Sequence, residues 1–201
     1  VVYTPAIPKD NRILTFFREN GYFLHKRAEV LGIVSRSKKA LCVAGTHGKT
    51  TTTTLLAFLL KNSSVGCSAF LGGISSNFNS NLLIDSDSEY VVIEADEFDR
   101  SFLRLRPEMA VITAMDADHL DIYGTKENMV EAFEEFARLT QGSLFLKKNL
   151  TIRSRAVDGY YAVGEVADYY ADHLRIENGA FHFDYISENV KMCDLCLRFP
   201  G

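Results

Sequence analysis

Short apolar runs alternate with amphipathic stretches over most of this chain. Five runs are short and largely apolar, as strands covered on both faces are, and they span residues 41–44, 67–71, 90–93, 110–113 and 143–146. Between them, residues 50–61 and 126–139 carry apolar side chains at helical spacing. Alternating strands and helices predict an α/β fold with a doubly wound, mostly parallel sheet.

Both ends of the chain depart from this alternation. Residues 12–20 and 27–34 read as helices, and the cluster Ser35-Arg-Ser-Lys-Lys39 that follows them reads as a solvated linker at a domain boundary. Residues 173–184 read as two strands joined at Asn178-Gly179, a strong hairpin signal, and residues 192–199 as another strand. These strands predict a small antiparallel β annex, on which we interpret His173 and His182 as surface or packing residues.

A glycine-rich segment follows the first buried run and precedes a helix. Gly45 and Gly48 allow the backbone to approach an anion, and the following helix offers free N–H groups. Lys49 supplies charge for outer phosphates as an exposed loop lysine, and the Thr50 hydroxyl suits Mg²⁺. Val43 stands where the usual phosphate-binding loop has its first glycine, so the loop is shorter than usual. The candidate ATP-binding residues are Gly45, Thr46, His47, Gly48, Lys49, Thr50 and Thr51.

Two alternatives accompany this interpretation. The segment would be an ordinary strand-to-helix turn if its lysine were incidental, and His47 would then be structural rather than a hydrogen-bonding contact to phosphate or substrate. The strand before the segment and the helix after it favour the functional interpretation. Separately, the apolar run 90–93 ends at Glu94, where an acidic side chain can reach a metal at the tip of a sheet, so Glu94 is a candidate metal ligand. Asp96 and Glu97 follow as supporting or merely loop carboxylates.

Composition narrows the range of functions. The 201 residues carry a formal charge of −4 with a pI of about 5.8, which argues against nucleic-acid binding. The longest apolar run, residues 55–60, is too short for membrane insertion, and no signal peptide opens the chain, so we expect a soluble cytoplasmic protein. Cys193 and Cys196 form a C-x-x-C pair without a second pair, so no zinc is expected.

Three segments in order resemble those of the Mur ligase family, ATP-dependent enzymes that attach amino acids to UDP-N-acetylmuramate in bacterial cell-wall synthesis. They read GTHGKT at 45–50, EADEFDRSFL at 94–103 and DADHLDIYG at 116–124. The resemblance implies ATP and Mg²⁺ as cofactors and catalytic roles for Lys49, Glu94 and His119. It implies Thr50 as a ligand of one Mg²⁺ that bridges the phosphates. It implies Glu94 and His119 as ligands of a second Mg²⁺, although a lone histidine more often packs in a core.

Within that family, the sequence of residues 101–107 is most similar to that of members that join L-alanine to UDP-N-acetylmuramate through an acyl phosphate. The resemblance implies that residues 1–39 are the tail of an N-terminal UDP-substrate domain with a linker. Residues 40–201 would be the central ATP-binding domain without its final helices, and a C-terminal domain would be absent. We therefore expect the fragment to be inactive by itself.

Other functions stay open at this point. A recycling ligase that adds an intact tripeptide to the same UDP sugar would place its acceptor pocket outside this chain. A simple P-loop kinase or NTPase would need no histidine ligand, and a fragment that does not bind nucleotide is also possible. The oligomeric state is left undetermined by the sequence.

Overall fold

The computed structural model describes residues 1–4, 7–116 and 123–198. Within these ranges the main sheet has the strand order β12-β11-β10-β9-β8-β7-β3-β6-β4-β5. Its strands are β3 (Lys39–Ala44), β4 (Ser68–Ser75), β5 (Ser80–Leu83), β6 (Tyr90–Ala95), β7 (Met109–Ile112), β8 (Ser143–Lys147), β9 (Gly159–Val163), β10 (Tyr169–Glu177), β11 (Ala180–Ser187) and β12 (Lys191–Leu197). The helices are α1 (Arg12–Glu19), α2 (Arg27–Ser37), α3 (Lys49–Lys61), the 3₁₀ helix η1 (Phe98–Arg104) and α5 (Lys126–Leu139).

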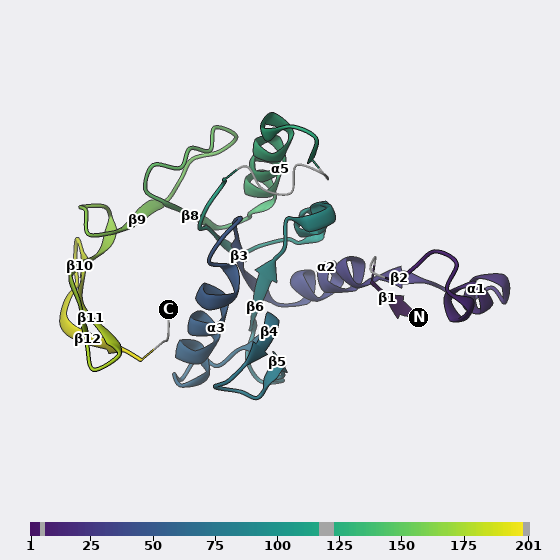
Figure 1. The fold of residues 1–201 in the computed structure, drawn as a ribbon, viewed down its shortest axis with the longest axis horizontal. Coiled ribbons are helices and arrows are strands. Elements are labelled where there is room, and N and C mark those ends of the chain that lie inside the picture. Colours follow the sequence, from purple (N-terminus) through teal and green to yellow (C-terminus); the bar gives the residue numbers. More distant parts are fainter. Residues whose placement is uncertain (5–6, 117–122, 199–201) are drawn as a thin grey trace.

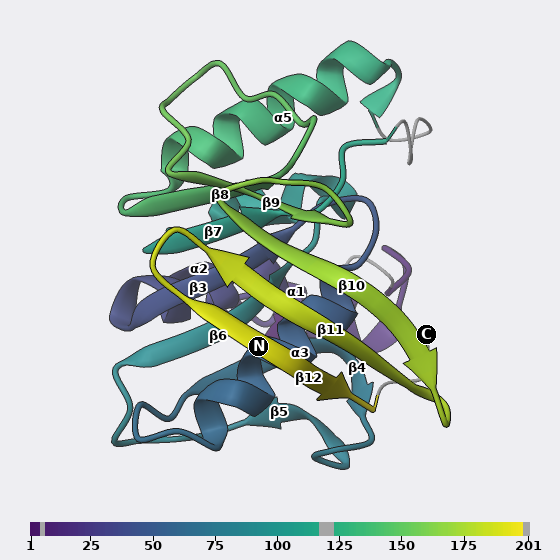
Figure 2. The same ribbon diagram turned by 90° about the vertical axis from the view of Figure 1, so that its left-hand side faces the viewer.

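The predicted parallel core is confirmed. Strands β4, β6, β3, β7, β8 and β9 pair in parallel in that spatial order, and the sequence pattern located all of them except β9. The chain leaves β3, builds β4 and β6 on one side of it (Figure 1), and then crosses to β7 on the other side (Figure 2). The end of β3 is therefore the topological switch point, where open α/β sheets bind their ligands.

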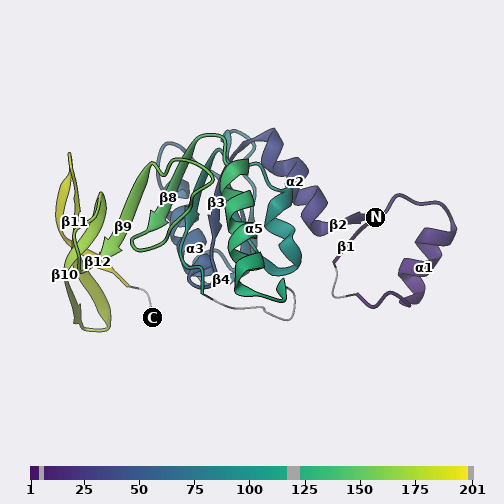
Figure 3. The same cartoon turned by 90° about the horizontal axis from the view of Figure 1, so that it is seen from above.

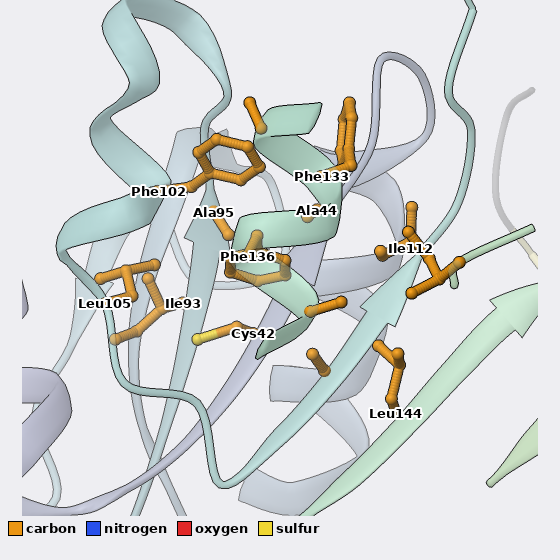
Figure 4. Close-up of a cluster of buried hydrophobic side chains, with 14 of the residues drawn as sticks. Cys42, Ala44, Ile93, Ala95, Phe102, Leu105, Ile112, Phe133, Phe136 and Leu144 are labelled. Carbon is orange, nitrogen blue, oxygen red and sulfur yellow. The ribbon is translucent and has the colours of Figure 1, made fainter. Parts of the chain in front are cut away.

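Side chains of β3 alternate between two hydrophobic clusters, one on each face of the sheet. Ala40, Cys42 and Ala44 belong to the cluster that contains α5 and η1, whereas Leu41 belongs to the cluster with α3. In the first cluster, whose side chains are drawn in Figure 4, the rings of Phe102 and Phe136 stack. Their centroids are 5.0 Å apart. This core fixes η1 and the turn before it against the sheet.

The antiparallel annex is also confirmed, but it continues the main sheet. β10 pairs in parallel with β9, and β11 and β12 add antiparallel strands beyond it (Figure 2). Asn178 (φ 49°) and Gly179 (φ 75°) form the predicted two-residue turn, because a type I′ hairpin needs positive φ at both positions. The annex therefore extends one edge of the sheet.

Both annex histidines have acidic partners that the sequence interpretation did not anticipate. His173 Nδ1 lies 3.0 Å from Asp184 Oδ2, and His182 Nδ1 lies 3.0 Å from Asp194 Oδ1. Each aspartate pKa is lowered, Asp184 chiefly by the backbone N–H of Asp194 and Asp194 chiefly by His182. In each pair one side chain is exposed and the other is partly buried.

The N-terminal residues lie at the other end of the molecule. The short strands β1 (Val2–Tyr3) and β2 (His25–Lys26) pair in parallel, and together with α1 they lie far from β10–β12 in Figures 1 and 3. No helix in the described ranges is long and apolar enough to cross a membrane.

The expected solvated linker is wrong in detail. Helix α2 continues through Ser37, and β3 already begins at Lys39. Ser35 is buried, and its hydroxyl is hydrogen-bonded there: Oγ donates to Gly32 O at 2.8 Å and accepts from Arg106 N at 3.0 Å. Gly32 faces the backbone of Arg104 so closely that a Cβ would overlap its carbonyl. These contacts attach α2 to η1 and the sheet; the domain boundary itself stays a prediction.

Candidate active site

The glycine-rich loop has the backbone geometry that a phosphate cradle requires. Gly45 has φ +134° and Gly48 has φ +80°, both in the region that favours glycine. A Cβ at Gly45 would overlap the Thr113 hydroxyl, so the loop approaches the end of β7 more closely than any side chain allows. Gly48 caps the N-terminus of α3, whose free N–H groups and dipole attract anions.

Contacts to the end of β7 hold the loop in place. The Thr113 hydroxyl lies within hydrogen-bond distance of the carbonyl oxygens of Ala44 and His47. Thr46 N donates to Ala114 O at 3.1 Å, and the buried Thr46 hydroxyl accepts from Asp116 N at 3.1 Å. The loop is therefore fixed to the strand that leads into residues 117–122.

Lys49 is not the exposed lysine that the sequence suggested. Its side chain is only 14% exposed, and its Nζ donates to Gly45 O at 2.8 Å and to Glu97 Oε1 at 2.9 Å. The Glu97 side chain is fully buried. A charge in that position needs a partner of opposite sign, so Lys49 neutralises a buried carboxylate as well as lining the groove.

Glu94 and Thr50 meet at the loop, a contact that was not predicted from the sequence. The Thr50 hydroxyl donates to Glu94 Oε1 at 3.0 Å, and Gly72 N donates to Oε2 at 2.8 Å. A Cβ at Gly72 would overlap this carboxylate, so β4 needs glycine there. Gly72 was not among the residues predicted from the sequence, although a glycine inside a strand pattern is a known signal that another group approaches the backbone closely.

The other predicted loop residues line the same groove. Thr51 lies on the first turn of α3 and is exposed. The His47 side chain is 67% exposed, with Nε2 3.8 Å from Asp116 Oδ2. His119 lies outside the described residues, as do its neighbours Asp118 and Asp121, so its expected meeting with Glu94 stays a prediction. Within the described ranges, the candidate site included, no three His, Cys, Asp or Glu residues group closely enough to hold a metal.

The groove extends from the loop to the apolar face of α2. Its volume is about 820 Å³, and Lys49, Thr50 and Glu94 lie at the loop end. Val30, Leu31, Val34 and Arg27 of α2 form part of the opposite wall. This wall could not be predicted from the sequence, because α2 reaches its place beside the loop by packing on η1, which is distant in the chain, and on β3. The arrangement suits an anionic ligand at one end and a larger, partly apolar ligand beside it.

The fold and this loop define the class of protein. The chain belongs to the Mur ligase family, because the family model described as the Mur ligase middle domain matches residues 43–176, more than half of the chain. Among curated proteins, it is 53% identical to the UDP-N-acetylmuramate–L-alanine ligase of Phocaeicola vulgatus and 50% identical to that of Parabacteroides distasonis. Both alignments cover the whole chain but 45% of the relative, so the chain spans about half the length of these relatives.

Solved structures agree with this assignment. The crystal structure of UDP-N-acetylmuramate–alanine ligase from Thermotoga maritima matches the whole chain and 47% of its own, with a TM-score of 0.85 and 27% identity. A ligase from Neisseria meningitides that is named for UDP-N-acetylmuramate and L-alanyl-gamma-D-glutamyl-meso-diaminopimelate matches the whole chain and 68% of its own. Its TM-score is 0.81 at 22% identity, which shows a shared fold alone.

Proposed function

We propose that the full-length protein carrying this chain is an ATP-dependent ligase that joins L-alanine to the carboxylate of UDP-N-acetylmuramate. The observation that carries the proposal is the convergence of Lys49, Thr50 and Glu94 on one groove beside the phosphate-binding loop. The names of relatives with 50–53% identity supply the substrates. We also propose that residues 1–39 belong to the UDP-substrate domain, that 40–201 form the central ATP-binding domain, and that the protein is cytoplasmic.

The reaction activates a carboxylate that is a poor electrophile. A carboxylate oxygen of the muramate attacks the γ-phosphorus of ATP, forming an acyl phosphate and releasing ADP. The amine of alanine then attacks the acyl carbon and expels inorganic phosphate, and the amine loses a proton as the amide forms. The loop amides and Lys49 stabilise the charge on the phosphate oxygens, so the protein acts mainly through position and electrostatics.

The residues present fit Mg²⁺. Thr50 and Glu94 offer hard oxygen ligands at the end of the loop, and Mg²⁺ typically takes one or two carboxylates together with phosphates and water. When bound, Mg²⁺ would neutralise charge on the phosphates. The Gly72 amide orients Glu94 for this role, and we propose His119 as a further ligand on the strength of the family resemblance.

Phosphate release by the full-length protein tests the proposal. With ATP and UDP-N-acetylmuramate, release should depend on L-alanine and should stop in Lys49→Met. Release that is stimulated by the tripeptide but not by alanine would instead indicate the recycling ligase. Phosphate release that needs neither L-alanine nor the tripeptide would indicate a simple NTPase. Either of these two results would overturn the proposal.

A further inference from the structure

The Lys49 ammonium is held before any phosphate reaches it. Its Nζ carries three hydrogens, of which one is directed to Gly45 O and another to Glu97. Both Glu97 oxygens lie within 2.9 Å of Nζ, and the carboxylate is fully buried. Because Lys49 lines the groove, the ammonium is fixed from behind while its remaining face is directed toward the ligand space.

Glu97 is itself held by a strained turn. Asp99 and Arg100, near the start of η1, both have φ +53°. Residues with a Cβ rarely adopt this region. The Tyr123 hydroxyl donates to Glu97 O at 2.6 Å, and the Arg100 guanidinium lies 5.5 Å from the Tyr123 ring centre. Phe102 then anchors the turn in the core by stacking on Phe136. The carboxylate therefore lies on a segment that these contacts anchor to the core.

We propose that Glu97 is a positioning residue that preorganises Lys49 for the phosphates, an inference that rests on the proposed nucleotide binding. A lysine on four flexible carbons loses conformational freedom when it binds a phosphate, and Glu97 fixes it in advance. Preorganised charge is more effective because nothing has to rearrange when the ligand binds. Glu97 thus acts through Lys49 and touches no phosphate itself.

A double-mutant cycle on the full-length protein tests this relationship. The binding of Mg²⁺ with adenylyl imidodiphosphate is measured by calorimetry for the wild type, Glu97→Gln, Lys49→Met and the double variant. Glu97→Gln keeps the side-chain shape and should weaken binding by about tenfold. In the Lys49→Met background the same change should have almost no effect, because its target is gone. If Glu97 had a purely structural role, Glu97→Gln would weaken binding equally in the wild-type and Lys49→Met backgrounds.

A matched pair elsewhere on the sheet provides the control. Lys39 Nζ lies 2.9 Å from Glu89 Oε2 in an exposed pair at the start of β3, away from the loop. Glu89→Gln should therefore leave binding unchanged. If Glu97→Gln does not fold, Glu97→Asp enters the same cycle, because it keeps the charge but withdraws it from Nζ.

The outcomes separate this inference from the proposed function. Additive losses, or a Glu97→Gln variant that binds like the wild type, would overturn the positioning role alone. A Lys49→Met variant that binds the nucleotide analogue normally would instead overturn the phosphate-binding role of the loop.

Discussion

The amide nitrogen of Gly72 donates a hydrogen bond to Glu94 Oε2 at 2.8 Å, and the glycine leaves no room for a Cβ beside that carboxylate. Gly72→Ala should therefore displace Glu94 and weaken Mg²⁺-dependent nucleotide binding by about tenfold or more. Gly73→Ala is the matched control, since its Cβ would meet only Thr50 Cγ2 at 4.0 Å. Calorimetric titration of both variants checks this, and equal affinities would contradict the role given to Gly72.

Removing Lys49 should reduce stability as well as activity. Lys49→Met leaves the fully buried Glu97 carboxylate without its ammonium partner, which costs about 3–5 kcal/mol in the free energy of unfolding. Lys49→Met with Glu97→Gln should recover most of that loss, because no buried charge then remains. Urea unfolding measures both variants. A Lys49→Met protein as stable as the wild type would show that the pair is not formed in solution.

The four thiols should divide into two classes. Cys42 and Cys67 are buried, and burial raises the pKa of each thiol, whereas Cys193 and Cys196 are exposed on β12. A thiol reagent at neutral pH should therefore label Cys193 and Cys196 rapidly, and Cys42 and Cys67 only after unfolding. Peptide mass spectrometry identifies the labelled sites. Early labelling of Cys42 would mean that the central strand β3 is not buried as described.

Stability should fall at high pH. Burial, together with the nearby Glu97 charge, raises the pKa of Tyr123 to about 12 from an ordinary value near 10. The folded state holds this proton more tightly, so Tyr123 stabilises the fold fully below about pH 10. This stabilisation, about 2–3 kcal/mol in the free energy of unfolding, is lost as the pH rises through about 12. Tyr123→Phe should make this fall in unfolding free energy shallower. Tyr161, whose pKa burial also raises to about 12, should retain part of it.

Glu94 and His119 are expected to act on one Mg²⁺. Changing either residue should weaken carboxylate activation, and changing both should cost less than the sum of the two losses. Alanine-dependent phosphate release by Glu94→Gln, His119→Ala and the double variant measures this. Full additivity would mean that the two residues do not share an ion and would return His119 to a structural role.

Local patterns in the sequence were enough to predict much of the scaffold. The apolar run of β3, the glycines of the loop and the start of α3 are consecutive, so one stretch of chain encodes the loop that we propose to hold phosphate. Helix α5 spans the predicted residues 126–139, because its apolar spacing needs no knowledge of its partners. The hairpin at Asn178-Gly179 was equally local, since positive φ at two adjacent positions selects those residues.

The tertiary structure alone decided which distant groups meet. Lys49 and Glu97 are 48 positions apart and Gly72 and Glu94 are 22 apart, so no local spacing could pair them. Strands β5 and β9 were not predicted and Ser35 was described as solvated, because strand pairing and close helix packing depend on neighbours elsewhere in the chain. The sequence by itself determined most of the elements and the residue types of the loop. The fold decided that the loop lysine is held by a buried carboxylate, because burial and pairing exist only after the strands are assembled.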